Sequence, residues 1–546
     1  MLLSSCLLAI ASFAAAVPTR DIKVRGSNAN AYAPSAAKCP AQKLVREATS
    51  INSLEEEYIQ KRRCNADASL AAWLEKQGSF CTTNLPVVGL ASSGGGNRAL
   101  LETAGVIKAF DARDGDDSVG GIFQALTYES GLSGGAWFLS SLAGNDWPTV
   151  SYLQETLWNE EFEDSLLVPE DIFSASGISD YSDVVAQVKA KEDAGFNTTI
   201  VDPWGRLISH ALLEGPDGGV SKRLSDMVKY SSFENHDVPF PIMTAISFNN
   251  SLNGCRLPNA ALQYEFTPYE YGSWDAGVKA FANTEYMGTD MTNGIPTDPS
   301  KCITQYDNLA YVLGVSSDVW TSYCTDFPPT NTSLSGVMID IITRASPDPI
   351  EFSDLAAYFP NPFHDLPTSP AVSDQETLTL IDGGLSGQVT PIWPFIQHHR
   401  TLDVLIATDN SADLSNNWPN GSSIHQTYLS SLEAGLTRMP FVPPAETFLA
   451  EGLNKRATFF GCNETSEKMM IVYLPNTEFV YPSNTSTSKL SYTKEETTGM
   501  IANGVEIALQ SGKEDWPLCL ACAIMSKEEG LPEGCKACFE EYCYYP

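Results

Sequence analysis

Positive charge is scarce in this sequence. The 546 residues include 33 lysines and arginines against 67 aspartates and glutamates, which gives a formal net charge of −34. A nucleic-acid-binding protein needs a basic stripe to neutralise phosphates, so this composition excludes a nucleic-acid partner. The same deficit argues against docking on anionic membranes by charge alone.

Internal repeats, linkers and low-complexity tracts are also missing. Without a repeat of about 20–50 residues, solenoids and propellers are excluded. A prior of roughly 100–200 residues per domain would divide the chain several times, but no Pro/Ser/Gly-rich segment marks a boundary. We therefore expect one large body with insertions over residues 39–546, ending in a cysteine-rich tail at 516–546.

Long apolar runs are limited to the N-terminus. Residues 2–17 are almost wholly apolar and end in three alanines, as a signal peptide does. The alternative, a membrane anchor, needs about 18 or more apolar residues, and this run stops at Pro18. We expect a signal peptide at 1–16, a short segment at 17–38, and a secreted extracellular protein. The C-terminus lacks the apolar tail of a lipid-anchor signal.

Cysteines and sequons agree with secretion. Cys6 would be removed with the signal peptide, which leaves twelve cysteines. An even number in a secreted protein predicts disulfides, although the sequence does not give their pairing. The twelve are Cys39, Cys64, Cys81, Cys255, Cys302, Cys324, Cys462, Cys519, Cys522, Cys535, Cys538 and Cys543. Cys519-x2-Cys522 and Cys535-x2-Cys538 also have the spacing of a zinc ribbon, an alternative that secretion disfavours. No other cluster has metal-ligand spacing, so we expect no metal and no cofactor. N-x-S/T sequons predict glycosylation at Asn197, Asn249, Asn331, Asn420, Asn463 and Asn484.

Short apolar runs predict buried strands separated by helical segments, and hence an α/β layered body. The expected strands lie at 85–91, 242–248, 378–381, 404–407 and 470–474, and residues 150–235 are expected to be helix or loop. The acidic runs at 55–57 and 160–164 are interpreted as solvated surface.

Two glycine-rich motifs carry the chemistry. Ser93-Gly94-Gly95-Gly96-Asn97-Arg98-Ala99 follows a strand and precedes a helix, so its backbone N–H groups can hold an anion, either a phosphate or an oxyanion. It is no P-loop, and a structural turn is the simpler alternative. Gly131-Leu132-Ser133-Gly134-Gly135 fits a nucleophile elbow that exposes the Ser133 hydroxyl. Together the two motifs indicate a hydrolase.

The base for this serine is less evident. None of the six histidines has an obviously catalytic setting; they are His210, His236, His364, His398, His399 and His425. Thr379-Leu380-Ile381-Asp382-Gly383-Gly384 instead places a carboxylate directly after an apolar strand. Asp-Gly-Gly is also a common turn, so this segment alone leaves both interpretations open.

The sequence resembles the secreted fungal lysophospholipase (phospholipase B) family, which is similar to the catalytic domain of cytosolic phospholipase A2 and more distantly to patatin. The matching segments run from Cys39 to Cys543 and are SGGGNRA (93–99), GLSGG (131–135), DPWGR (202–206), YEFTPYEYGSWD (264–275), IDGG (381–384), WPNGSS (418–423), FFGCN (459–463), CLACA (519–523) and CKACFEEYC (535–543). Two segments depart from the family pattern, Gly314-Val315-Ser316-Ser317 and the Leu-Ser-Gly after Gly384, which bears on specificity.

The resemblance implies a three-layer α/β/α patatin-like catalytic domain with insertions over 39–546. It implies a catalytic dyad of Ser133 and Asp382 without histidine, an oxyanion hole from the Gly95 and Gly96 amides, and Arg98 near the substrate phosphate. The substrate would be a lysophospholipid, or both acyl chains of a diacyl phospholipid, at a micelle or membrane surface, with no protein partner. The alternatives are a neutral-lipid esterase with a Ser-Asp-His triad and a catalytically silent lipid-binding glycoprotein.

Overall fold

The computed structural model describes residues 28–115, 117–165, 175–248, 261–321, 338, 341–344, 351–465 and 467–546. The predicted signal peptide, the sequons at Asn249 and Asn331, and Cys255 and Cys324 lie outside the described residues. Within the described part, no helix combines the length and apolarity needed to cross a membrane.

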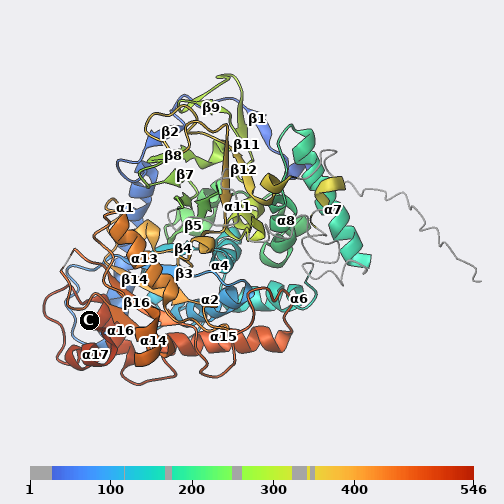
Figure 1. The fold of residues 1–546 in the computed structure, drawn as a ribbon. Helices are drawn as coiled ribbons and strands as arrows, with labels where there is room; N and C mark the ends of the chain where they lie inside the picture. The colour runs from blue at the N-terminus through green and yellow to red at the C-terminus, as the bar shows by residue number, and fades with distance from the viewer. Residues whose placement is uncertain are drawn as a thin grey trace, which may run out of the picture.

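A mixed β-sheet forms the centre of the molecule (Figure 1). Its strands follow the order β15 (Thr458–Phe460), β16 (Met470–Pro475), β14 (Val404–Asp409), β3 (Val88–Ser92), β4 (Leu126–Gly131), β5 (Phe240–Ser247), β6 (Gln263–Phe266), β7 (Glu270–Ser273), β8 (Ala280–Asn283) and β2 (Val45–Glu47). The strands from β16 to β5 pair in parallel, and the flanking pairs are antiparallel. The runs predicted as buried strands are confirmed: they correspond to β3, β5, β13 (Thr377–Ile381), β14 and β16.

The sheet branches along one edge of β5. On that edge β4 pairs with the first half of β5, ending at Gly131 opposite Met243. Beyond it β13 pairs with the end of β5, with Ile381 opposite Ile246, while β6 occupies the other edge. Because β4 is parallel and β13 antiparallel to β5, the C-terminal ends of β4 and β13 point toward each other. Their last partners on β5, Met243 and Ile246, are three positions apart, a rise of about 10 Å along the strand.

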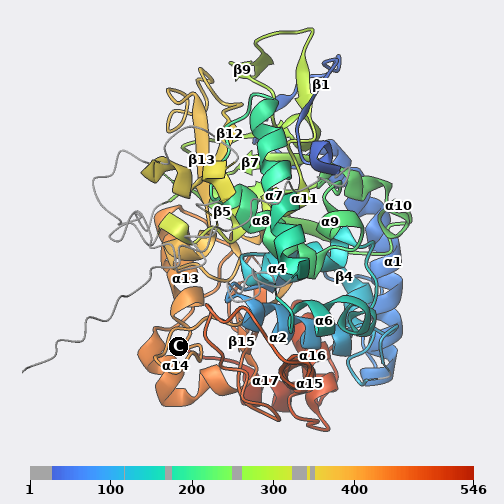
Figure 2. The same ribbon diagram turned by 90° about the vertical axis from the view of Figure 1, so that its right-hand side faces the viewer.

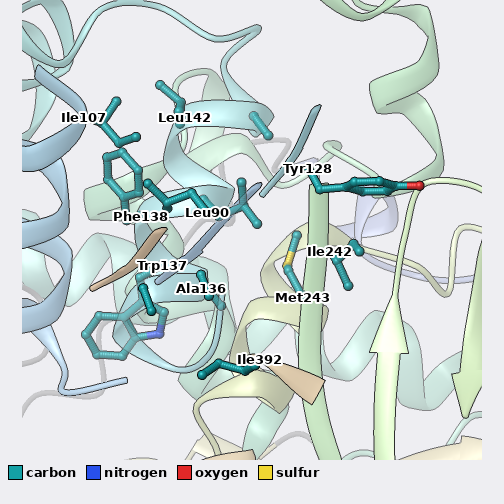
Figure 3. Packing of buried hydrophobic residues seen from close by; sticks show 14 of the residues in the cluster. Leu90, Ile107, Tyr128, Ala136, Trp137, Phe138, Leu142, Ile242, Met243 and Ile392 are labelled. Atoms are coloured by element: carbon teal, nitrogen blue, oxygen red, sulfur yellow. The ribbon is translucent and has the colours of Figure 1, made fainter. Parts of the chain in front are cut away.

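Helices cover both faces of the sheet. On one face, Tyr58 of α1 (Ser53–Gln77) packs against Phe240, and Glu55 contacts the Tyr128 hydroxyl. On the other, Ser140 of α4 (Gly134–Gly144) contacts Met243, and Figure 3 shows Phe138 and Leu142 of α4 beside Ile107 of α2 (Asn97–Phe110). Outside α2 lies α15 (Lys494–Leu509), which runs alongside it in both views (Figures 1 and 2). This is the expected three-layer α/β/α arrangement.

Residues 150–165 and 175–235 are largely helical, within the helix-or-loop expectation, and include α7 (Ala175–Asp193) and α8 (Val201–Leu212). The interpretation of the acidic run at 55–57 as solvated surface is wrong for Glu55, which is 1% exposed. Its carboxylate pairs with Arg400, 2.8 Å away, and Arg400 also pairs with Glu265 at 2.6 Å. A partner 345 residues distant along the chain therefore stabilises this buried charge.

Disulfides staple the C-terminal tail. Cys519 pairs with Cys538 and Cys522 with Cys535, joining α16 (Trp516–Ile524) to α17 (Cys535–Tyr542). These pairs confirm the disulfide interpretation of the tail over the zinc ribbon. Two more bridges join Cys39 to Cys302 and Cys462 to Cys543. The prediction is wrong for Cys64 and Cys81, which are exposed free thiols.

Candidate active site

Ser133 lies on a sharp turn between β4 and α4, as the elbow motif predicts. Its backbone adopts φ 52° and ψ −120°, a conformation that residues with a side chain rarely adopt. The next two positions must be glycine because other backbone segments lie too close for a side chain. A Cβ on Gly134 would lie 2.1 Å from the Gly96 carbonyl oxygen, and a Cβ on Gly135 would lie 2.1 Å from the Ser92 carbonyl oxygen. The turn therefore packs directly against the first glycine-rich motif.

Asp382 follows the last residue of β13, so the branch in the sheet brings it toward Ser133. The side chain is buried, at 3% exposure. Its Oδ1 accepts a hydrogen bond of 2.7 Å from Gly384 N. Burial raises the pKa of the Asp382 carboxyl to about 6, although hydrogen bonds from the Ser133 side chain and the Gly384 backbone counteract part of that rise.

The glycine-rich motif forms the N-terminal end of α2. Gly94 N donates to Val389 O at 3.0 Å. The N–H groups of Gly95 and Gly96 have no acceptor among the described residues, and both glycines have positive φ, 141° and 64°. Two free donors at the positive end of a helix, next to Ser133, are suited to bind an anion.

Arg98, expected near the substrate phosphate, is surrounded by protein atoms in this structure. Its side chain is fully buried, and Nε and one terminal nitrogen both donate to Asn410 O, at 3.0 and 2.9 Å. The other two terminal contacts go to Thr485 O and Thr487 Oγ1. Because protein oxygens take up most of the guanidinium donors, Arg98 ties α2 to two loops.

The described histidines are engaged elsewhere. His210 is partly buried, and desolvation of its ring lowers its pKa to about 3, while His425 Nδ1 lies 2.9 Å from Val442 O. His398 and His399 are exposed, and the His399 ring stacks on Trp274. Burial of the carboxyl, Ser133 and Gly384 account for the shifted pKa of Asp382, and the buried Asp318 carboxyl interacts with it electrostatically. The structure thus brings Ser133, Asp382, Gly95 and Gly96 together without a histidine.

Two contacts at this site escaped the sequence reasoning. Ser133 N donates to both the carbonyl oxygen and the hydroxyl of Ser316, each at 3.1 Å. Asp382 N donates to Asp318 O, also at 3.1 Å. The only signal in the sequence was that residues 314–317 depart from the family pattern, which gave no reason to place them beside the dyad.

The described sequons differ in accessibility. Asn197 and Asn463 are exposed, whereas Asn420 and Asn484 are partly buried. The Asn484 Nδ2 atom, to which a glycan would be attached, donates to Asn416 O at 2.8 Å. Clusters of three or more histidine, cysteine, aspartate or glutamate side chains that could hold a metal ion are absent from the described ranges.

Comparison with solved structures places the fold among the cytosolic phospholipases A2. Human GIVD cytosolic phospholipase A2 superimposes with a TM-score of 0.69 at 18% identity, covering 89% of this chain and 69% of that one. The same enzyme in complex with methyl gamma-linolenyl fluorophosphonate gives a TM-score of 0.64, covering 91% and 70%. These matches define the fold class: a mixed α/β fold that resembles the one in these enzymes.

The family follows from the sequence comparisons. The profile of the lysophospholipase catalytic domain matches residues 88–545. Lysophospholipase 2 of Candida albicans is 37% identical, over 95% of this chain and 89% of its own length, and lysophospholipase 3 of the same species is 35% identical over 95% and 75%. Probable lysophospholipase 3 of Schizosaccharomyces pombe is 34% identical over 94% and 82%. The chain belongs to the lysophospholipase family.

Proposed function

We propose that this protein is a secreted lysophospholipase (phospholipase B) that cleaves fatty-acyl esters through a Ser133–Asp382 dyad and an acyl-enzyme. Asp382 takes the hydroxyl proton as Ser133 attacks the ester carbonyl. The N–H groups of Gly95 and Gly96 bind the oxyanion of the tetrahedral intermediate. Collapse of that intermediate expels the lysophospholipid or glycerophospho alcohol, which takes the proton from Asp382. Water, activated by the same carboxylate, then releases the fatty acid.

The observation that carries this proposal is the environment of Asp382. An ordinary carboxylate with a pKa near 3.9 is a weak base toward a serine hydroxyl. Burial raises the pKa of Asp382 to about 6, closer to a working pH near neutrality, where a general base is most effective. The Ser133 side chain is close enough to this carboxyl to lower its pKa in part, so the nucleophile and the base are near each other.

The proposal is tested with lysophosphatidylcholine as substrate and release of fatty acid as readout. Ser133→Ala and Asp382→Asn should each lower kcat by at least about 10²-fold, the scale of general-base loss, while both variants remain folded. A fluorophosphonate probe should add to Ser133 stoichiometrically, with the site read by peptide mass spectrometry. Appreciable turnover by purified Ser133→Ala would exclude this nucleophile.

The two alternative functions give different results. A Ser-Asp-His triad predicts that one His→Ala variant is as inactive as Ser133→Ala. A catalytically silent lipid-binding protein predicts neither fatty-acid release nor fluorophosphonate labelling. A neutral-lipid esterase predicts turnover of triacylglycerol that exceeds turnover of lysophosphatidylcholine, and a diacyl phosphatidylcholine arm shows whether both acyl chains are removed.

Secretion, removal of residues 1–16 and glycosylation are part of the same proposal. The exposure of Asn197 and Asn463 favours these two among the described sequons. Expression of the full chain in a eukaryotic host should give medium-borne protein that begins after residue 16 and loses mass on treatment with an N-glycosidase. Protein retained in the cell with an intact N-terminus would contradict this part.

A further inference from the structure

The segment at the C-terminal end of α11 (Leu309–Ser316) contacts both halves of the proposed dyad. The last carbonyls of a helix lack partners within the helix. Here the Ser316 carbonyl accepts from Ser133 N, and the Asp318 carbonyl accepts from Asp382 N, both at 3.1 Å. Ser133 and Asp382 are 249 positions apart in sequence, and this one segment of three residues is bonded to the backbone of each.

The Ser316 hydroxyl adds a directed contact. It donates its hydrogen to Thr244 O on β5 at 2.7 Å. Its oxygen therefore acts as the acceptor for Ser133 N, which lies 3.1 Å away. Chains of hydrogen bonds of this kind polarise and strengthen each other in a dry site. Ser316 is completely buried, so water does not compete for these partners.

The helix that carries Ser316 is firmly seated. A Cβ on Gly205 of α8 would lie 2.1 Å from the Ala310 carbonyl oxygen, and one on Gly314 would lie 3.0 Å from the Gly205 Cα. The backbones of α8 and α11 are therefore in direct contact, with no side chains between them. Close packing of this kind has little freedom to shift, so the position of the helix end is well defined.

We propose that Ser316 is a positioning residue of the lysophospholipase reaction, which holds the backbone of Ser133 so that the nucleophile faces Asp382. The inference rests on the proposed dyad. The strained backbone of Ser133, with φ 52°, would otherwise relax toward commoner conformations, and its hydroxyl would lose the alignment that proton transfer requires. Ser316 does not touch the substrate; it acts through Ser133.

The experiment compares two neighbouring hydroxyls on the same helix end. Ser316→Ala removes the contact to Ser133 N while leaving the carbonyl contact in place. Ser317→Ala is the matched control, because Ser317 is also buried, at 2% exposure. Its hydroxyl donates to Leu313 O and Gly314 O and accepts from Trp204 Nε1, and among the described residues it has no hydrogen bond with Ser133 or Asp382. Both variants are assayed for kcat and KM on lysophosphatidylcholine, for the second-order rate of fluorophosphonate addition, and for thermal unfolding.

Ser316→Ala should lower kcat and the labelling rate about three- to tenfold, the effect of one neutral hydrogen bond, with KM unchanged. Ser317→Ala should leave both rates within about twofold of wild type. Ser316→Thr keeps the hydroxyl and should restore the labelling rate relative to Ser316→Ala. If Ser316→Ala does not fold, Ser316→Cys and Ser317→Cys replace the pair, since a thiol is a weak acceptor.

Equal slowing at both positions, or a fall in unfolding temperature without any change in labelling rate, would overturn the positioning role. These outcomes are separate from failure of the dyad. If Ser133→Ala is inactive but Ser316→Ala labels at the wild-type rate, the nucleophile stands and the positioning role is wrong. If Ser133→Ala still turns over substrate, the proposed function itself is wrong.

Discussion

Replacing Asp382 with asparagine should make the protein inactive and, above pH 6, more stable. The carboxyl is buried and its pKa is raised to about 6, so its ionisation in the folded protein is unfavourable. Asparagine keeps the shape, can accept the hydrogen bond from Gly384 N and cannot ionise. Its Nδ2 can donate to the Ser133 hydroxyl, so the replacement leaves no obvious unpaired group.

The size and sign of this effect follow from proton linkage. A rise from the ordinary 3.8 to about 6 corresponds to about 3 kcal/mol. Below pH 4 the carboxyl is protonated in both folded and unfolded chains, and the wild type bears no penalty. Between pH 4 and 6 only the unfolded chain ionises, so the wild type loses stability as the pH rises. Above pH 6 the full penalty is present and stays constant.

The assay is thermal unfolding at one fixed heating rate, at intervals from pH 4 to pH 8. For a chain of this length a stability change of about 1 kcal/mol shifts Tm by about 1–2 °C, on the scaling of Tm with chain length. The Tm of Asp382→Asn minus the Tm of wild type should therefore be several degrees larger at pH 8 than at pH 4. Ser133→Ala is the inactive control. It keeps the carboxyl and removes a hydrogen bond that lowers its pKa, so it should not show this gain. A difference between Asp382→Asn and wild type that is the same at pH 4 and pH 8 would refute the reasoning.

Four further predictions concern activity. The kcat/KM of the wild type should rise with pH through about 6, as the buried Asp382 carboxyl ionises; a flat profile from pH 4 to 8 would contradict this. Arg98→Lys should slow a lysophospholipid and a phosphate-free p-nitrophenyl ester by the same factor and lower Tm, because the side chain binds loop oxygens; a selective loss on the phospholipid would restore the phosphate role. Activity should survive EDTA, whereas a reductant strong enough to open Cys519–Cys538 and Cys522–Cys535 should lower Tm; stoichiometric zinc in the purified protein would speak against the disulfides. Single alanine variants should each retain most activity at His210, His236, His364, His398, His399 and His425.

Local sequence patterns were sufficient for the parallel centre of the sheet and for the elbow. A buried strand such as β3 has a continuous apolar run, and the close approaches at Gly134 and Gly135 need glycine whatever surrounds them. These features are decided within a few residues of the chain, so one sequence is enough to predict them.

Long-range partners could not be predicted in the same way. Glu55 looks like part of a solvated acidic run until the fold places Arg400 beside it. Arg98 follows a glycine-rich turn, as a phosphate ligand would, yet its partners come from Asn410, Thr485 and Thr487, more than 300 residues further along. A charge in a sequence predicts that a partner exists, but only the packing decides which one.

The role of Asp382 illustrates how the topology turns a common turn sequence into a candidate base. Asp-Gly-Gly after a strand is unremarkable as a pattern, and in a simple parallel sheet it would lie one strand or more away from the nucleophile. Here β4 stops at Gly131 and β13 occupies the rest of the same edge of β5 in the opposite direction. Two strand ends thus meet, with the serine on one and the carboxylate on the other. The proposed base, Asp382, can therefore lie next to the proposed nucleophile, Ser133, without a histidine between them. Both strands pair with β5, but Ser133 and Asp382 lie beyond the last paired residues, and there the end of α11 accepts from both backbones through Ser316 and Asp318.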